Sequence, residues 1–134
     1  QQLRIIEKMT SDFNYDINII PCPIIREPSG LAMSSRNKYL SSIQKEKSRI
    51  IFSTLKLGFR SIKNGNRNIT KLKGILNNNL KKEANIRLDY LKIVDYKTLK
   101  EFDQCCGNEF TICIAACIGE VRLIDNINYL FSED

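Results

Sequence analysis

Histidine and tryptophan are both absent from this sequence of 134 residues. Histidine is the commonest general base and a common zinc ligand, so its absence excludes Ser-His and Cys-His nucleophile pairs and histidine-based metal sites. Any chemistry must therefore depend on lysine, arginine, carboxylates, hydroxyls, thiols or backbone amides. The sequence also lacks an apolar run of about 18 residues or more, so we expect no membrane-spanning segment.

The cysteines form no pattern that predicts a disulfide framework or a zinc site. There are five of them, an odd number, and no two have C-x-x-C spacing. Two lie in the apolar run 110–118, where thiols usually act as small buried hydrophobes. We therefore expect no metal site and a reducing, cytoplasmic location. The cysteines are Cys22, Cys105, Cys106, Cys113 and Cys117.

The overall composition is that of a globular protein, with 43% apolar and 27% charged residues. It predicts one domain, or one domain and a piece of another. A net charge of +6 permits an anionic partner such as a nucleotide, a phosphorylated metabolite or a nucleic acid. An AT-rich genome also enriches lysine, so charge alone identifies no ligand. Because the first residue is Gln1 and not methionine, we expect further sequence upstream.

The first forty residues predict a helix, a strand and a long loop. Apolar residues recur at helical spacing over residues 1–13, which predicts an amphipathic helix. Isoleucines in residues 17–20 predict a short buried strand, and a helix followed by a strand is typical of a doubly wound sheet. Residues 23–40 have neither period, and loops of this length are usually functional or disordered. The apolar face of the first helix comprises Leu3, Ile6, Met9 and Phe13.

Two helices are expected after the loop. Ser41 and Gln44 have the spacing of a capping box, which predicts that a helix begins there, and Asn64-Gly65 predicts its end. Leucine and isoleucine recur at helical spacing over residues 69–84, which predicts a second helix. Two helices joined by a short turn favour an antiparallel pair.

The remaining sequence predicts β-structure. Strands are expected over residues 86–95, 110–118 and 121–127, with a short helical connection over Tyr96–Phe102. Gly119-Glu120 can form a two-residue type II′ turn, so the last two strands are expected to form a hairpin. Together these elements predict an α+β fold in which a helix pair packs on a small antiparallel sheet.

The loop before the first long helix is the most informative segment. Residues 30–38 contain the hydroxyls of Ser34 and Ser35, the guanidinium of Arg36 and the ammonium of Lys38. Hydroxyls and backbone amides donate to phosphate oxygens, and arginine provides a planar fork with a permanent charge. The same residues also suit ordinary turns and helix caps. Composition alone therefore leaves two interpretations, phosphate binding and turn structure.

The sequence around this loop extends the pattern. Residues 26–37 read Arg-Glu-Pro-Ser-Gly-Leu-Ala-Met-Ser-Ser-Arg-Asn, and Tyr39-Leu40-Ser41 follow. Three further stretches, residues 1–3, 89–95 and 119–126, agree in order and spacing. Together these stretches resemble the signature of the pantothenate synthetase, or pantoate–β-alanine ligase, family, and the resemblance spans essentially the whole chain. One departure is Ser29, where many family members have Asp.

The resemblance implies an ATP-dependent condensation of pantoate with β-alanine to give pantothenate. Pantoate's carboxylate would attack the α-phosphorus of ATP, and the amine of β-alanine would then displace AMP from the pantoyl adenylate. ATP would be a substrate, accompanied by Mg²⁺. The resemblance further implies a cytoplasmic bacterial enzyme that is a homodimer when complete and has no nucleic-acid or membrane partner.

The resemblance also implies which residues form the site. Ser34, Ser35 and Arg36 would be catalytic residues that hold the triphosphate, as the family's version of a KMSKS loop. Gln2 would bind pantoate, and no residue would be a metal ligand. ATP binding would fall to Ile25, Met33, Ser34, Ser35 and Arg36.

The family's organisation implies two domains in this chain. Residues 1–40 would be the end of a Rossmann-like nucleotide-binding domain together with the ATP-binding loop, and residues 41–134 would be a C-terminal lid. A larger N-terminal domain with a paired-histidine motif would precede Gln1, so the chain alone is expected to be inactive. Charged residues after the hairpin turn, among them Arg122 and Asp125 with Asn126, are expected to form structural salt bridges and caps.

Two alternatives stay open from the sequence. One is another adenylate-forming nucleotidyltransferase, such as a fragment of an aminoacyl-tRNA synthetase, although the last ninety residues have no aromatic stacking pattern interleaved with basic residues. The other is a basic nucleic-acid-binding module without catalysis, whose affinity would fall steeply with salt.

Overall fold

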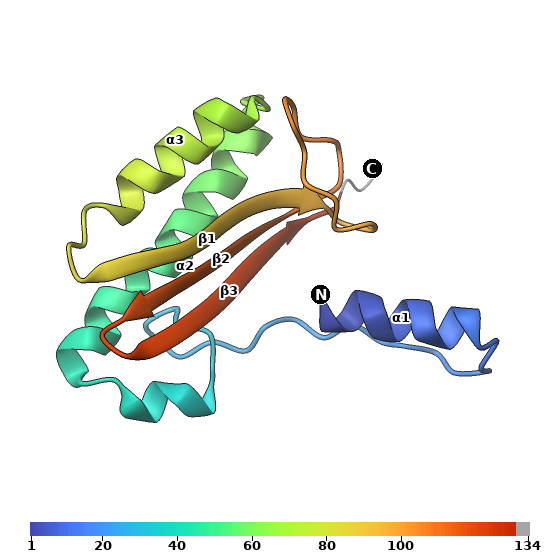
Figure 1. Cartoon of the computed structure of the whole chain (residues 1–134), viewed down its shortest axis with the longest axis horizontal. Helices are drawn as coiled ribbons and strands as arrows, with labels where there is room; N and C mark the ends of the chain where they lie inside the picture. The colour runs from blue at the N-terminus through green and yellow to red at the C-terminus, as the bar shows by residue number, and fades with distance from the viewer. Residues whose placement is uncertain (131–134) are drawn as a thin grey trace.

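Helices and one antiparallel sheet form the fold. The structure, a computed structural model, describes residues 1–130. Its elements are α1 (Gln2–Asp12), the 3-10 helix η1 (Ser35–Tyr39), α2 (Ser42–Lys63), α3 (Ile69–Leu80), β1 (Ile86–Asp95), β2 (Phe110–Ile118) and β3 (Val121–Tyr129). The strand order is β1-β2-β3, and α2 and α3 cover one face of the sheet (Figure 1). This arrangement confirms the expected α+β fold. Among these residues no helix combines the length and the apolarity that crossing a bilayer requires.

Helix α2 begins at the expected capping box. The hydroxyl of Ser41 accepts a hydrogen bond from the Gln44 amide at 3.2 Å, and the Gln44 side chain accepts one from the Ser41 amide at 2.9 Å. Helix α3 begins at a similar cap, where Asn68 accepts from the Lys71 amide at 2.8 Å. Each cap satisfies amides that the first helical turn leaves without a backbone partner.

Helix α3 ends at Leu80, four residues before the expected end at 84. The Lys82 and Glu83 amides bond to the carbonyls of Asn79 and Leu80, three residues earlier, so the chain tightens into turns. These turns lead directly into β1, which begins at Ile86. Since the asparagines 77–79 are weak helix formers, helical propensity does not oppose this early end.

The core lies between the sheet and the two helices. In the strand register Ile112 of β2 faces Ile93 of β1 and Ile127 of β3. Helix α2 approaches β2 closely, because a Cβ atom added at Gly58 would lie 2.6 Å from the Cδ1 atom of Ile112. The fully buried large side chains include Ile51, Leu55, Leu72, Leu76, Ile93, Phe110, Ile112, Ile114 and Ile118.

The β2–β3 hairpin has the expected turn. Gly119 has φ 58°, whereas Glu120 has no positive φ, which fits a type II′ turn with glycine at its first central position. Strand β3 continues to Tyr129, two residues beyond the expected end at 127. The extension is stabilised by Phe110, whose ring stacks on Tyr129 with 5.1 Å between the centroids.

The expected helical connection over 96–102 is wrong, because this segment is a turn. The Asp95 carboxylate accepts hydrogen bonds from the amides of Lys97 and Thr98, at 3.1 and 2.7 Å, and from the Thr98 hydroxyl. Leu99 then has φ 59°, which a helix does not allow. An aspartate that binds amides two and three residues ahead competes with helix formation, which explains the difference.

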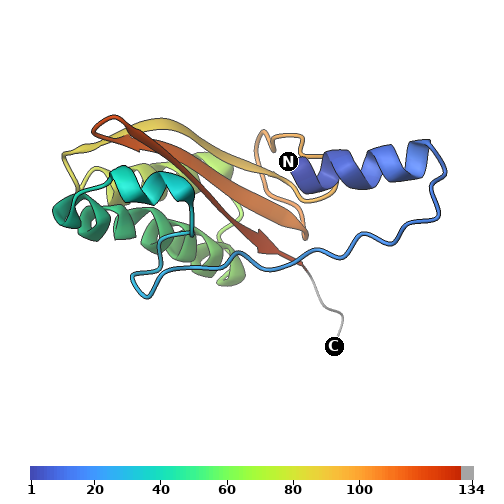
Figure 2. The ribbon, with the colours of Figure 1, turned by 90° about the horizontal axis from the view of Figure 1, so that it is seen from below.

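Helix α1 confirms the first expected helix, but it lies beyond one end of the sheet, away from α2 and α3 (Figure 2). It contacts this end of the sheet through the Arg4 guanidinium, which lies 3.8 Å from the centroid of the Tyr96 ring. The expected apolar face is largely exposed, with exposed fractions of 45% for Met9 and 67% for Phe13. The expected strand over 17–20 is wrong, because a strand needs a hydrogen-bonded neighbour and none lies beside these residues within 1–130.

Candidate functional site

The loop before α2 is anchored by a small β-bridge. Arg26 and Ala32 pair as antiparallel neighbours, and the Met33 amide donates to the Ile25 carbonyl at 3.0 Å. The turn of this loop needs glycine at position 30, which has φ 92° and packs on Phe52 of α2. We call residues 25–33 the anchor hairpin. The anchor hairpin therefore fixes the position of the backbone from which Ser34 and η1 continue.

Ser34 and Arg36 lie where the anchor hairpin leads into η1. The Ser34 side chain caps η1 by accepting a hydrogen bond from the Arg36 amide at 3.2 Å. Asn37, which is 4% exposed, donates to Glu27 at 2.7 Å and to the Ala32 carbonyl at 3.0 Å. These contacts hold η1 against the anchor hairpin and leave the side chains of Ser34 and Arg36 exposed.

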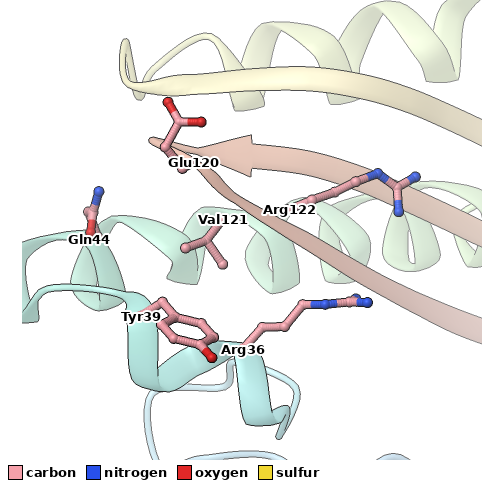
Figure 3. Close-up of a pocket in the computed structure, with 6 residues that line it drawn as sticks. All are labelled: Arg36, Tyr39, Gln44, Glu120, Val121 and Arg122. Carbon is pink, nitrogen blue, oxygen red and sulfur yellow. The ribbon is translucent and has the colours of Figure 1, made fainter.

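Two adjacent cavities lie between η1 and the β3 end of the sheet. The larger has a volume of about 700 Å³ and the smaller about 170 Å³, and both are lined by Arg36 and Arg122. Figure 3 shows Arg36 and Tyr39 on η1, with Val121 and Arg122 on β3 across the cavity. The larger cavity is completed by Gln44 and Glu120.

The two arginines of this cavity differ in their partners. Arg122 is bound by Asp89 of β1, with 2.7 Å from Nη2 to Oδ2, and this hydrogen bond raises the pKa of Arg122. Arg36 makes no side-chain hydrogen bond or ion pair within residues 1–130. All the donors of the Arg36 guanidinium are therefore available for an anion, whereas Asp89 already engages Nε and Nη2 of Arg122.

The cysteines do not contribute to this site. Burial raises the pKa of the Cys106 and Cys113 thiols, which keeps them protonated and weakly reactive. In the part of the chain that the structure describes, no three acidic or cysteine side chains cluster in a way that could hold a metal ion.

Comparison with known proteins places these residues in a family. The sequence model of the family described as Pantoate-beta-alanine ligase matches residues 1–128. The chain belongs to the pantoate–β-alanine ligase family. The pantothenate synthetase of Caldicellulosiruptor saccharolyticus is 41% identical over 127 residues, which cover 95% of this chain and 45% of the relative. That of Thermotoga neapolitana is 38% identical over 94% of this chain and 45% of the relative.

Solved structures agree with the fold of this family member. The pantothenate synthetase of Thermus thermophilus matches 94% of this chain and 45% of its own with a TM-score of 0.85 and 28% identity. The Francisella tularensis enzyme, solved with Beta-gamma ATP and Beta-alanine, matches 94% of this chain and 39% of its own with a TM-score of 0.56 and 31% identity. This pantoate–β-alanine ligase chain thus spans about half the length of the curated relatives it matches.

The structure brings together most of the site residues expected of a pantoate–β-alanine ligase. Ser34, Ser35 and Arg36 follow the anchor hairpin, and Met33 is tied to Ile25 by a backbone hydrogen bond. Their roles in ATP binding stay predictions. Gln2 is exposed in the first turn of α1 and lines neither of the two cavities, so its role in pantoate binding also stays a prediction.

Sequence reasoning missed part of this site. It did not find Tyr39, Gln44 or Glu120 as cavity-lining residues, nor the contact of Arg26 with Asp125. The only signal was that Arg26 and Asp125 both lie in stretches that carry the family resemblance. As expected, Asp125 and Arg122 each form a salt bridge within the fold.

Proposed function

We propose that this chain is the C-terminal part of an enzyme that joins pantoate to β-alanine at the expense of ATP. The observation that carries this proposal is the exposed Arg36 guanidinium at the cavity, in a chain whose family is pantoate–β-alanine ligase. The match over residues 1–128 favours this activity over another adenylate-forming enzyme and over a nucleic-acid-binding module.

In the first step a carboxylate oxygen of pantoate attacks the α-phosphorus of ATP, and pyrophosphate leaves. Negative charge grows on the phosphate oxygens, so fixed cationic donors lower the barrier. Arg36 supplies the charge. The Ser34 hydroxyl already accepts a hydrogen bond from the Arg36 amide, so its proton is free to be donated to a phosphate oxygen. Ser35 supplies a second hydroxyl, and Mg²⁺ would arrive as part of the ATP complex.

In the second step the amine of β-alanine attacks the carbonyl carbon of pantoyl adenylate, and AMP leaves. Water would compete with the amine for pantoyl adenylate, so closure of a lid over the adenylate protects this intermediate from hydrolysis. We assign this role to the sheet with α2 and α3.

The domain boundary near Leu40, between the nucleotide-binding part and the lid, stays a prediction. The burial of Leu31 and Leu40 in the core of this unit favours a boundary before Arg26.

The test is pantoate-dependent exchange of labelled pyrophosphate into ATP. The chain is joined behind the N-terminal part of the Caldicellulosiruptor saccharolyticus relative, and folding is verified by a cooperative thermal transition. We expect Arg36→Ala to lower the exchange rate about 100-fold or more, as loss of a transition-state donor does. The matched control is Arg49→Ala, which removes an exposed arginine on α2 that pairs with Glu46. Near-normal exchange by Arg36→Ala, or none by the folded unsubstituted protein, would contradict the proposal.

A further inference from the structure

The most buried ion pair of the described residues joins the anchor hairpin to β3. Arg26 of the anchor hairpin and Asp125 of β3 are 99 residues apart in sequence, and their side chains are 18% and 4% exposed. Two parallel hydrogen bonds join them, from Nη1 to Oδ2 at 2.6 Å and from Nη2 to Oδ1 at 3.0 Å. A bidentate pair of this kind fixes the orientation of the guanidinium relative to the carboxylate as well as the distance between them.

The Arg26 guanidinium also joins the other elements that surround it. Nη1 donates to the Gly30 carbonyl of its own hairpin at 3.1 Å, and Nη2 approaches the Asn126 carbonyl at 3.4 Å. The guanidinium carbon stacks on the Phe52 ring of α2, 3.8 Å from the centroid. One side chain therefore ties the anchor hairpin to both β3 and α2.

The contacts continue from this pair to the phosphate-binding groups. The Met33 amide bonds to the Ile25 carbonyl next to Arg26, and Asn37 of η1 bonds to Glu27 on the other side of it. Ser34 and Arg36 lie between these two fixed points. Their position relative to β3 therefore depends on the Arg26–Asp125 pair.

We propose that Arg26 and Asp125 are positioning residues that make the Ser34–Arg36 segment move as one body with the C-terminal sheet. The inference rests on the proposed function. When the C-terminal sheet closes over the bound nucleotide, it would then carry the Ser34 and Ser35 hydroxyls and the Arg36 guanidinium onto the triphosphate. Neither Arg26 nor Asp125 lines the cavities, so they act through the loop and not on the substrate.

The test compares Arg26→Gln, Asp125→Asn and the double variant in the joined protein described above. We expect each single variant to raise the KM for ATP about tenfold in pyrophosphate exchange, because removing one partner of a buried pair frees the loop. The double variant is expected to be no worse than the singles, since both changes break one coupling. The rate of the second step, measured from preformed pantoyl adenylate and β-alanine, is expected to change less than twofold. Arg26→Lys keeps the charge without the fork and is expected to restore only part of the loss.

The control for general destabilisation is Thr54→Val. Thr54 is fully buried and accepts a hydrogen bond from Asn79 at 2.8 Å between α2 and α3, away from the loop. We expect it to lower the unfolding temperature without raising the KM for ATP. The inference is overturned if Thr54→Val raises that KM as much as Arg26→Gln, or if Arg26→Gln and Asp125→Asn leave it unchanged.

Hydrogen exchange on this chain alone separates the inference from the proposed function. In Arg26→Gln the amides of Leu31, Met33 and Asn37 are expected to exchange faster, while those of β2 keep their wild-type rates. Unchanged protection at these three amides would reject the coupling even where the enzyme is active. A wild-type joined protein without activity, but with faster exchange in Arg26→Gln, would reject the proposed function and keep the coupling.

Discussion

Single residues in this fold act through backbone freedom as well as through chemistry. Gly30 and Gly119 both have positive φ, at 92° and 58°, and each forms a turn in a segment of the candidate site, beside Phe52 and Gln44 of α2 respectively. Gly119 lies in the β2–β3 hairpin next to Gln44, whose side chain accepts a hydrogen bond from the Ser41 amide at the start of α2 and also lines the larger cavity. Glycine at these turns therefore contributes to the shape of the site without touching a substrate.

A matched pair of glycine substitutions tests this role. Gly119→Ala is expected to lower the free energy of unfolding by about 1–2 kcal/mol, because an L-residue is strained at positive φ. Gly74→Ala in α3 meets no atom within 4 Å and is expected to raise it by up to about 1 kcal/mol through helix propensity. Urea titrations of the chain measure both. Equal effects of the same sign in the two variants would contradict the explanation.

At the scale of elements, local signals decided what the sequence could predict. The capping box at Ser41, the end of α2 at Asn64 and the type II′ turn at Gly119 each depend on residues a few positions apart, and the structure contains all three. The absence of the expected strand over 17–20 and the contact of Arg26 with Asp125 both depend on whether a distant segment lies alongside, which spacing in one sequence does not reveal. Phosphate binding by the loop could be predicted because its hydroxyls and guanidinium are consecutive in the sequence, and it stays a prediction.

The turn after β1 gives a prediction for pH dependence. Hydrogen bonds from Thr98 and Lys97 lower the pKa of Asp95 below its ordinary value of 3.8. The unfolded chain therefore binds a proton first as pH falls, and the stability contributed by ionised Asp95 is lost as pH drops through its folded pKa. Asp95→Asn keeps an acceptor oxygen but does not titrate. We expect wild type to lose more stability than Asp95→Asn between about pH 6 and about pH 2 in urea titrations. Parallel curves for the two proteins would show that the turn does not depend on the charge.

At the scale of the whole molecule, the described residues form two unequal parts. The sheet with α2, α3 and the anchor hairpin has a continuous core, whereas α1 and the segment after it expose Met9, Phe13 and Ile20 at 45%, 67% and 76%. Exposed apolar side chains in such a run usually mark a surface that another part of a protein covers. The chain also spans only 45% of the relative from Caldicellulosiruptor saccharolyticus.

This division predicts how the isolated chain behaves. It carries Arg36 and its cavity, so we expect weak ATP binding, detected by titration calorimetry and reduced further in Arg36→Ala. We expect no pantothenate from ATP, pantoate and β-alanine, because groups on one side of a nucleotide do not align a carboxylate with the α-phosphorus. Adding the N-terminal part of the relative, in trans or by fusion, is expected to restore turnover. Pantothenate formed by the isolated chain would show instead that the second half of the site lies within these 134 residues.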